Sequence, residues 1–211
     1  MSELDAGLPQ VSKVLSALRE TKMQVVANSS CGMHVHVGVE GGMRLMHAKK
    51  VFTLAALLDQ PVMLSGARAG IALHLREPGQ GKCRLDVDDS SSDEESSGED
   101  KRPDFDFEGT QSTYEFRFPQ MSFDKDFIKH WAELVCKIIE LAMLPAPQFA
   151  ALLERVSGVL EEIEDAKGEG LEKIWPVLNL QHQIPFWHAQ LERHKRGEFI
   201  SHVDARGTLR P

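Results

Sequence analysis

The chain has 211 residues, of which 42% are hydrophobic and 27% are charged, a composition typical of a soluble globular protein. Its formal net charge of −8 is concentrated in one segment, because Asp86 to Asp100 contains eight acidic residues and no basic one. The rest of the chain is neutral and has no basic stripe to neutralise phosphates, which excludes nucleic acid as an expected partner.

The cysteines and the apolar segments indicate a cytoplasmic protein without a membrane partner. Cys31, Cys83 and Cys136 are far apart and form no CxxC motif, so neither a disulfide framework nor a zinc ribbon is expected. The first ten residues contain no basic segment followed by an apolar run, which is unlike a signal peptide. The longest apolar-rich stretch, WAELVCKIIELAML, is too short and too charged to span a bilayer.

The first third of the chain is predicted to alternate between helices and strands. From Val11 onward, apolar residues recur at i, i+3, i+4 and i+7, which is typical of an amphipathic helix. Pro61 is expected to end the second helix. The predicted elements are a helix over Leu8–Lys22, strands over Met23–Ala27 and Met33–Val39, and a helix over Arg44–Leu58.

The middle of the chain is predicted to carry an insertion and the remainder to be mainly helical. Residues 77–103 are rich in glycine, serine and acids, and they have little apolar surface to offset chain entropy, so a disordered acidic insertion is expected. Ser122 is the predicted N-cap of a long helix. The predicted elements are strands over Ile71–Arg76, Asp104–Phe107 and Ser112–Phe118, a helix over Phe123–Leu144, and mostly helical structure over 148–196 with breaks near 168–170 and Pro185.

Two of the predicted strands carry ionisable groups on one face only. Side chains alternate across a strand with a period of two. In CGMHVHVG, His34 and His36 fall on one face, and a methionine and valines fall on the other. In STYEFRFP, Glu115 and Arg117 fall on one face, and aromatic residues fall on the other. If both strands belong to one sheet, their polar faces converge on a common cleft.

These residue types suit a metal ion and a phosphate. Neutral imidazole and carboxylate are metal ligands, and the forked guanidinium of arginine matches phosphate oxygens. The alternative is that the histidines serve packing and that Glu115 and Arg117 form a cross-strand ion pair on a solvated face. A site is favoured because the two motifs occur together, each opposite an apolar face.

A cupin metal site is a further alternative, because Glu40 follows the two histidines as a cupin motif requires. That motif places glycines where this chain has Asn28 and His47, and the helices predicted after Pro119 disfavour a cupin barrel. The remaining histidines, including His74 and His182, show no paired ligand spacing, and surface or packing roles are expected for them.

At the two polar-faced strands the chain resembles the amidoligase family of fungi and bacteria. Members show an asparagine, a short gap and a Cys-Gly-x-His-Val-His-Val run, matched here by Asn28 and CGMHVHVG. They later show a Thr-x-Glu-Phe-Arg strand followed by a helix that contains a tryptophan, matched by TYEFR at Thr113 and by Trp131. The family is similar in turn to glutamine synthetase and glutamate–cysteine ligase. The resemblance extends over about Leu8 to Leu144.

The resemblance implies an ATP-dependent ligase that joins a carboxylate to an amine through an acyl phosphate. His34 and Glu115 would bind Mg²⁺, and His36 would contact ATP or its phosphates. Arg117 would stabilise charge on the transferring phosphoryl group. The implied partners are small-molecule or peptide carboxylates and amines. A homo-oligomer is compatible with the resemblance, since glutamine synthetases build sites between subunits.

The implied fold class is α+β, with a curved antiparallel sheet and helices on its outer face, as in the catalytic fold of glutamine synthetase. Residues 1–145 would form this amidoligase-like unit, and residues 146–211 would add a helical segment. Family members supply further glutamates from a strand before the first helix, for which this chain offers only Glu3. That departure favours a competing hypothesis, a non-catalytic amidoligase-like protein that binds metal or nucleotide at most.

Overall fold

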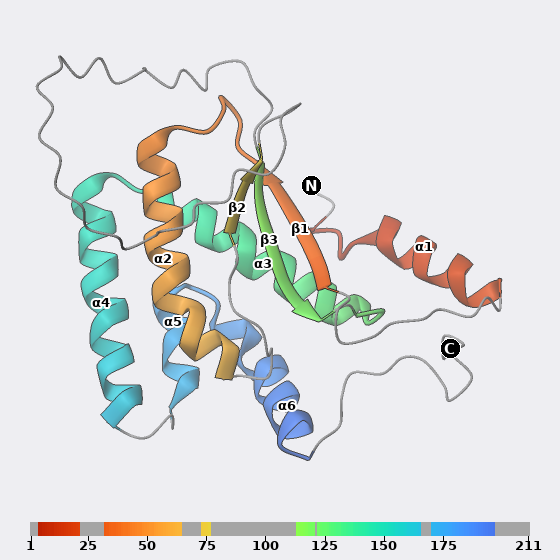
Figure 1. The fold of residues 1–211 in the computed structure, drawn as a ribbon. Helices are drawn as coiled ribbons and strands as arrows, with labels where there is room; N and C mark the ends of the chain where they lie inside the picture. Colours follow the sequence, from red (N-terminus) through yellow and green to blue (C-terminus); the bar gives the residue numbers. More distant parts are fainter. Residues whose placement is uncertain are drawn as a thin grey trace, which may run out of the picture.

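A small antiparallel sheet lies against a set of helices that makes up most of the described chain (Figure 1). The computed structural model describes residues 4–21, 32–64, 73–76, 113–120, 122–165 and 170–196. The predicted strands over Met23–Ala27 and Asp104–Phe107 and the acidic segment 77–103 lie outside these residues. The α+β class is confirmed by what is described.

The described elements follow the predicted order along the chain. They are α1 (Pro9–Glu20), β1 (Gly32–Gly38), α2 (Leu45–Leu64), β2 (Leu73–Arg76), β3 (Thr113–Gln120), α3 (Lys125–Ala142), α4 (Ala146–Asp165), the 3₁₀ helix η1 (Leu171–Lys173), α5 (Ile174–Val177), the 3₁₀ helix η2 (Gln181–Gln183) and α6 (Ile184–Lys195).

Two predicted helix ends are wrong. Helix α2 continues through Pro61 to Leu64. Proline holds φ near the helical value, so a helix can continue through it at the cost of one backbone hydrogen bond and some distortion. The N-cap of α3 is Asp124 rather than Ser122, since the Asp124 side chain accepts hydrogen bonds from two first-turn amides. The Ser122 hydroxyl instead accepts from the backbone N–H of Asp124 at 3.1 Å.

Strand β3 lies at the centre of the sheet, with β1 on one side and β2 on the other, and both pairs are antiparallel. Phe116 pairs with Val35 of β1 and with Leu73 of β2. Tyr114 pairs with Val37 and with Leu75 in the same way. Because directly opposed residues share a face, these apolar positions align in rows across the sheet.

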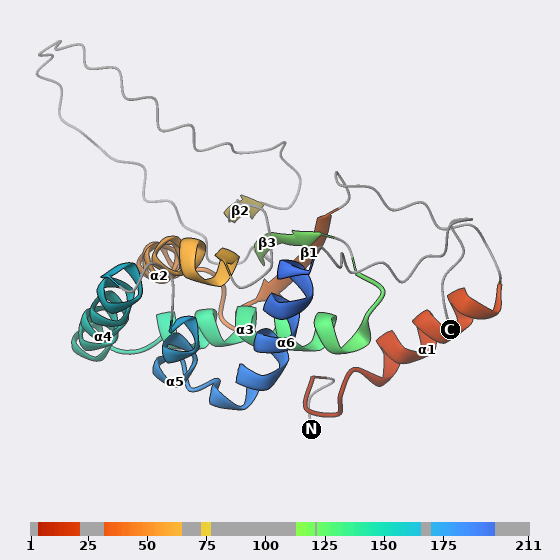
Figure 2. The ribbon, with the colours of Figure 1, turned by 90° about the horizontal axis from the view of Figure 1, so that it is seen from below.

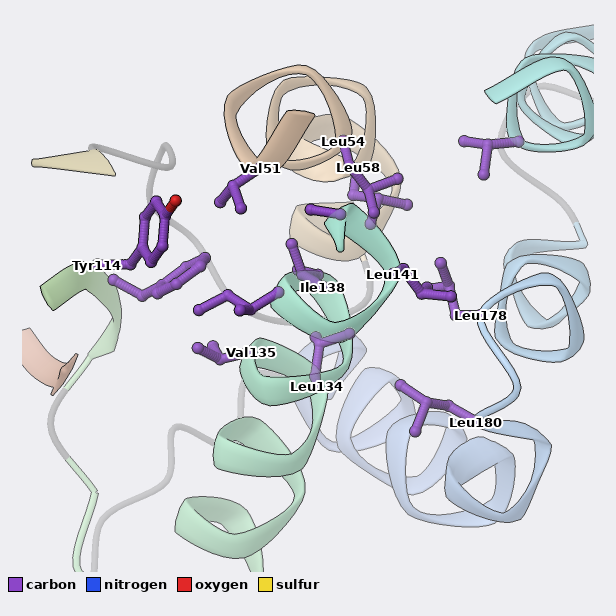
Figure 3. Packing of buried hydrophobic residues seen from close by; sticks show 14 of the residues in the cluster. Val51, Leu54, Leu58, Tyr114, Leu134, Val135, Ile138, Leu141, Leu178 and Leu180 are labelled. Carbon is purple, nitrogen blue, oxygen red and sulfur yellow. The ribbon is translucent and has the colours of Figure 1, made fainter. Parts of the chain in front are cut away.

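The apolar face of the sheet belongs to the hydrophobic core, and α3 lies at the centre of that core (Figure 3). Tyr114 and Phe116 are each 1% exposed. Leu134 and Val135 of α3 are fully buried, and complete burial of such a side chain contributes roughly 1.5–3 kcal/mol. Figure 2 shows α3 beneath the sheet, while no described helix covers the opposite face. The opposite face, which carries His34, His36 and Glu115, is therefore the outer face of the sheet.

One core cluster includes residues from both units predicted from the sequence. It contains Leu58 of α2 and Phe116 of β3, and it also contains Leu152 of α4 and Trp187 of α6. Helix α2 packs on α3 and α4, and α4 packs on α5. The C-terminal helices thus share their core with the sheet.

Helix α1 packs on α3 through a separate, smaller cluster. Leu15 and Phe123 are buried there, each 6% exposed. Arg19 adds a link from α1 to the residues just before α3, because its Nη2 donates to the backbone carbonyl of Phe123 at 3.2 Å. Within the described residues, no helix has the length and apolarity needed to cross a bilayer.

Candidate functional site

The two polar-faced strands are neighbours in the sheet. His36 is paired with Glu115, and His34 is paired with Arg117. The exposure of β1 alternates along its length, with both histidines exposed and the valine between them half-buried. The structure therefore brings His34, His36 and Glu115 to one face, as the alternation of both strands predicts.

The carboxylate of Glu115 is the centre of this group. Its Oε1 lies 3.0 Å from His34 Nδ1 and 3.6 Å from His36 Nε2. The Glu115 side chain is 5% exposed, whereas the histidines are 43% and 41% exposed. A buried carboxylate is stabilised by a nearby cation or by donors. Here an imidazole N–H can donate to the carboxylate, or a metal ion can be bound between these groups.

Thr113 positions the ring of His36. The Thr113 Oγ1 lies 3.3 Å from His36 Nδ1. When Nδ1–H donates to this hydroxyl, the neutral ring presents its Nε2 lone pair toward Glu115. Metal-binding histidines commonly have such a partner on the second ring nitrogen, which fixes both tautomer and ring orientation. The sequence places Thr113 in the TYEFR motif, on the face of Glu115, but it does not predict this role.

The structure describes the other predicted site residues only in part or not at all. Arg117 occupies its expected position on β3, but its side chain lies outside the described part. Asn28, Cys31 and Glu3 also lie outside the described residues. The predicted contacts of Arg117 and His36 with ATP thus stay predictions.

Sequence reasoning missed a third residue in register with Glu115. Strand β2 pairs His74 with Glu115, on the side opposite to His36. The signal was present in the alternation of Leu-His-Leu-Arg over 73–76, which matches the alternation of the other two strands. Only the pairing of β2 with β3 shows which residue of β2 lies opposite Glu115.

The described donors are an incomplete set for a metal ion. No group of three or more histidine, cysteine, aspartate or glutamate side chains within the described part is arranged to hold one. Glu115 offers an oxygen of the kind that Mg²⁺ prefers, while His34 and His36 offer nitrogen. The residues fit a divalent cation that draws further ligands from water, phosphate oxygens or other residues of the chain.

A second histidine–carboxylate group lies in the helical part of the molecule and has a structural role. His182 Nε2 lies 2.8 Å from Glu133 Oε1, and Gln183 Nε2 donates to Glu133 Oε2 at 2.8 Å. The Gln183 Oε1 in turn accepts from Trp187 Nε1 at 2.7 Å. Burial and the neighbouring Glu133 raise the pKa of the Cys136 thiol, so this cysteine is not activated as a nucleophile.

Comparison with known proteins finds a family model that matches part of the chain. The model of the family described as "Putative amidoligase enzyme" matches residues 2–64. No curated protein and no solved structure gives a significant match to the chain. The matched segment contains α1, β1 and α2, and therefore both histidines of the site. Residues 2–64, which carry His34 and His36, are therefore similar to this family.

Proposed function

We propose that the protein is an ATP-dependent carboxylate–amine ligase that forms an amide bond through an acyl phosphate. The observation that carries this proposal is the 3.0 Å approach of His34 to Glu115. His34 lies in the segment matched by the amidoligase family, and Glu115 belongs to the second strand by which the chain resembles that family. The substrates would be a small-molecule or peptide carboxylate and an amine.

Each residue of the polar face would have its own role in the reaction. Glu115 and His34 would hold a divalent cation, for which Mg²⁺ is the ion that the family implies. ATP bound with that cation would supply the phosphoryl group that activates the carboxylate. His36, held by Thr113 at 3.3 Å, would orient the phosphates. Arg117 is paired with His34 across the strands, and its forked guanidinium suits a phosphoryl group that gains charge during transfer.

Trapping of the acyl phosphate tests this proposal directly. Pure protein would be mixed with ATP, Mg²⁺, hydroxylamine and a panel of amino acids and peptides. The expected result is hydroxamate together with released phosphate for at least one carboxylate. Glu115→Gln should abolish both signals, while His182→Gln should retain them because that histidine lies in the helical part. Absence of hydroxamate and phosphate across the panel, from protein with a native circular dichroism spectrum, would contradict the proposal.

A non-catalytic amidoligase-like protein is the second candidate. It is favoured by the incomplete set of metal donors among the described side chains and by the limitation of the family match to residues 2–64. Calorimetric titration with ATP and Mg²⁺ separates the candidates. Binding without hydroxamate formation supports the second candidate, and turnover excludes it.

A further inference from the structure

A threonine of β3 and a histidine of β1 meet diagonally across the outer face of the sheet. Thr113 Oγ1 lies 3.3 Å from Nδ1 of His36, although the residue paired directly with Thr113 is Gly38. The Thr113 methyl group lies on the Gly38 side, where a Cβ added to the glycine would contact it at 3.9 Å. Threonine is β-branched and restricted at χ1, so its hydroxyl is directed toward His36.

The second ring nitrogen of His36 faces a carboxylate. Nε2 of His36 lies 3.6 Å from Oε1 of Glu115, whose side chain is 5% exposed. An ionised carboxylate only accepts hydrogen bonds, whereas a hydroxyl both donates and accepts. With the proton on Nδ1, the Nε2 lone pair would face the carboxylate oxygen, and the two would repel each other unless a cation lay between them. With the proton on Nε2, the N–H points toward Glu115, and Nδ1 accepts from the Thr113 hydroxyl.

We propose that Thr113 is a positioning residue that holds His36 as the Nε2–H tautomer and so makes it a hydrogen-bond donor on the outer face of the sheet. This role rests on the proposed function, in which His36 contacts the phosphates of ATP. Phosphate oxygens accept hydrogen bonds, so they need an N–H and not a lone pair from the imidazole. The His36 side chain is 41% exposed, and a phosphate that approaches its Nε2 meets a donor that is already in place.

Nitrogen NMR of the full chain reads the tautomer directly. Long-range ¹⁵N–¹H spectra of protein labelled at its histidine rings distinguish the two neutral tautomers from each other and from the charged ring. The spectra would be recorded without metal or nucleotide, at a pH at which the His36 ring is neutral, and His36→Gln identifies the resonances of His36. We expect the Nε2–H tautomer in the wild type. A wild-type ring in the Nδ1–H tautomer would overturn the proposal, whatever the variants show.

Threonine variants show whether the hydroxyl is the cause. Thr113→Val keeps the shape of the side chain and removes the hydroxyl, so the Nδ1 resonance of His36 should shift and the share of the Nδ1–H tautomer should rise roughly two- to tenfold. Thr113→Ser keeps the hydroxyl and should give spectra close to those of the wild type. Thr53→Val is the matched control, since it removes a hydroxyl that donates to the Lys49 carbonyl at 2.9 Å in α2, and it should leave the His36 resonances unchanged.

Equal His36 spectra in the wild type and in folded Thr113→Val would overturn the proposal. If that variant does not fold, the same comparison is made with Thr113→Ala.

Nucleotide binding separates the role of Thr113 from the proposed function. Calorimetric titration with ATP and Mg²⁺ should show roughly two- to tenfold weaker binding in Thr113→Val and recovery in Thr113→Ser. A changed His36 tautomer without ATP binding in the wild type would support the positioning role and contradict the ligase. Equal ATP affinity in the wild type and in Thr113→Val would overturn the contribution of this tautomer to phosphate binding, even if hydroxamate assays show an active ligase.

Discussion

Glu115 and Glu133 are both paired with histidine, but their surroundings give the two pairs different roles. Both oxygens of Glu133 have separate partners, His182 and Gln183, each at 2.8 Å. At Glu115, two imidazoles approach the same oxygen. Complete pairing by neighbouring elements is typical of a structural network, whereas two imidazoles beside one carboxylate oxygen can donate to it or can share a cation with it.

Packing reinforces this difference. Gln183 is fully buried and connects Glu133 of α3 to Trp187 of α6 through hydrogen bonds of 2.8 and 2.7 Å. Trp187 stacks on Trp175 with parallel rings 5.5 Å apart and contacts Phe127 edge to face. The histidines beside Glu115 are more than 40% exposed. His182 is also exposed, at 55%, so the two pairs differ in the hydrogen-bond partners of the glutamate and not in the exposure of the histidine.

The hydrogen-bonded residues Glu133, His182, Gln183 and Trp187 form what we call the helical network. The largest expected effect is the loss of stability when this network loses the Trp187 side chain. Trp187→Ala should lower the free energy of unfolding by roughly 3–5 kcal/mol, because it removes a large side chain that is 2% exposed. Urea denaturation followed by circular dichroism measures the change. Trp187→Phe should lose less, since part of the ring packing survives. A loss below about 1 kcal/mol for Trp187→Ala would show that this region does not hold the core together.

The hydrogen bonds of the helical network should contribute the next largest effect. Gln183→Leu leaves Glu133 Oε2 and Trp187 Nε1 without the partners at 2.8 and 2.7 Å. A buried polar group that loses its partner costs about 1–3 kcal/mol, so thermal unfolding should shift to lower temperature. Mg²⁺ affinity should stay unchanged. A stability equal to that of the wild type would mean that the network is dispensable and would remove the contrast with Glu115.

Exchange of the two carboxylates for amides tests the comparison itself. Glu115→Gln should weaken Mg²⁺ binding at least about tenfold, which corresponds to about 1.4 kcal/mol, because a charged ligand of the proposed cation is lost. Glu133→Gln should leave Mg²⁺ binding intact and reduce stability by about 1 kcal/mol. Calorimetric titration and urea denaturation of both variants give the two readouts. The assignment of roles is wrong if Glu133→Gln is the variant that loses metal.

The sequence predicted the faces of the strands better than their pairing. Alternation alone places His34 and His36 opposite the valines of β1, because the period of a strand is two. It cannot set the register, since a shift of β1 by two residues keeps every face and changes every partner. The row that joins His36, Glu115 and His74 depends on that register. A surface or packing role is expected for His74, and only the pairing of β2 with β3 places position 74 opposite Glu115.

The helix ends show a similar limit of local rules. Ser122 and Asp124 are both good N-cap residues, and the choice between them depends on which amides the chain presents after Phe123 enters its cluster with Leu15. Pro61 is a strong stop signal in a sequence, yet α2 extends to Leu64. Upstream in that helix, Val51, Leu54 and Leu58 are buried in the core, and their packing favours continuation.

The smallest expected effect concerns Tyr114, the neighbour of Glu115 on the opposite face of β3. Its side chain is 1% exposed, its hydroxyl has no hydrogen-bond partner among the described residues, and burial raises its pKa from 10.0 to about 12. Between these two values the unfolded chain loses the phenolic proton while the folded chain keeps it. Stability should therefore fall as the pH rises from about 10 to 12.

Tyr114→Phe should remove that dependence, and at pH 8 it should change the free energy of unfolding by less than about 1 kcal/mol. Urea denaturation at pH 8 and pH 11 measures both effects. Mg²⁺ affinity should not change, because the hydroxyl lies on the core side of the strand whose other face carries Glu115. A loss of Mg²⁺ affinity together with an unchanged pH dependence would mean that Tyr114 supports the polar face rather than the core, and the separation of the two faces of β3 would fail at this residue.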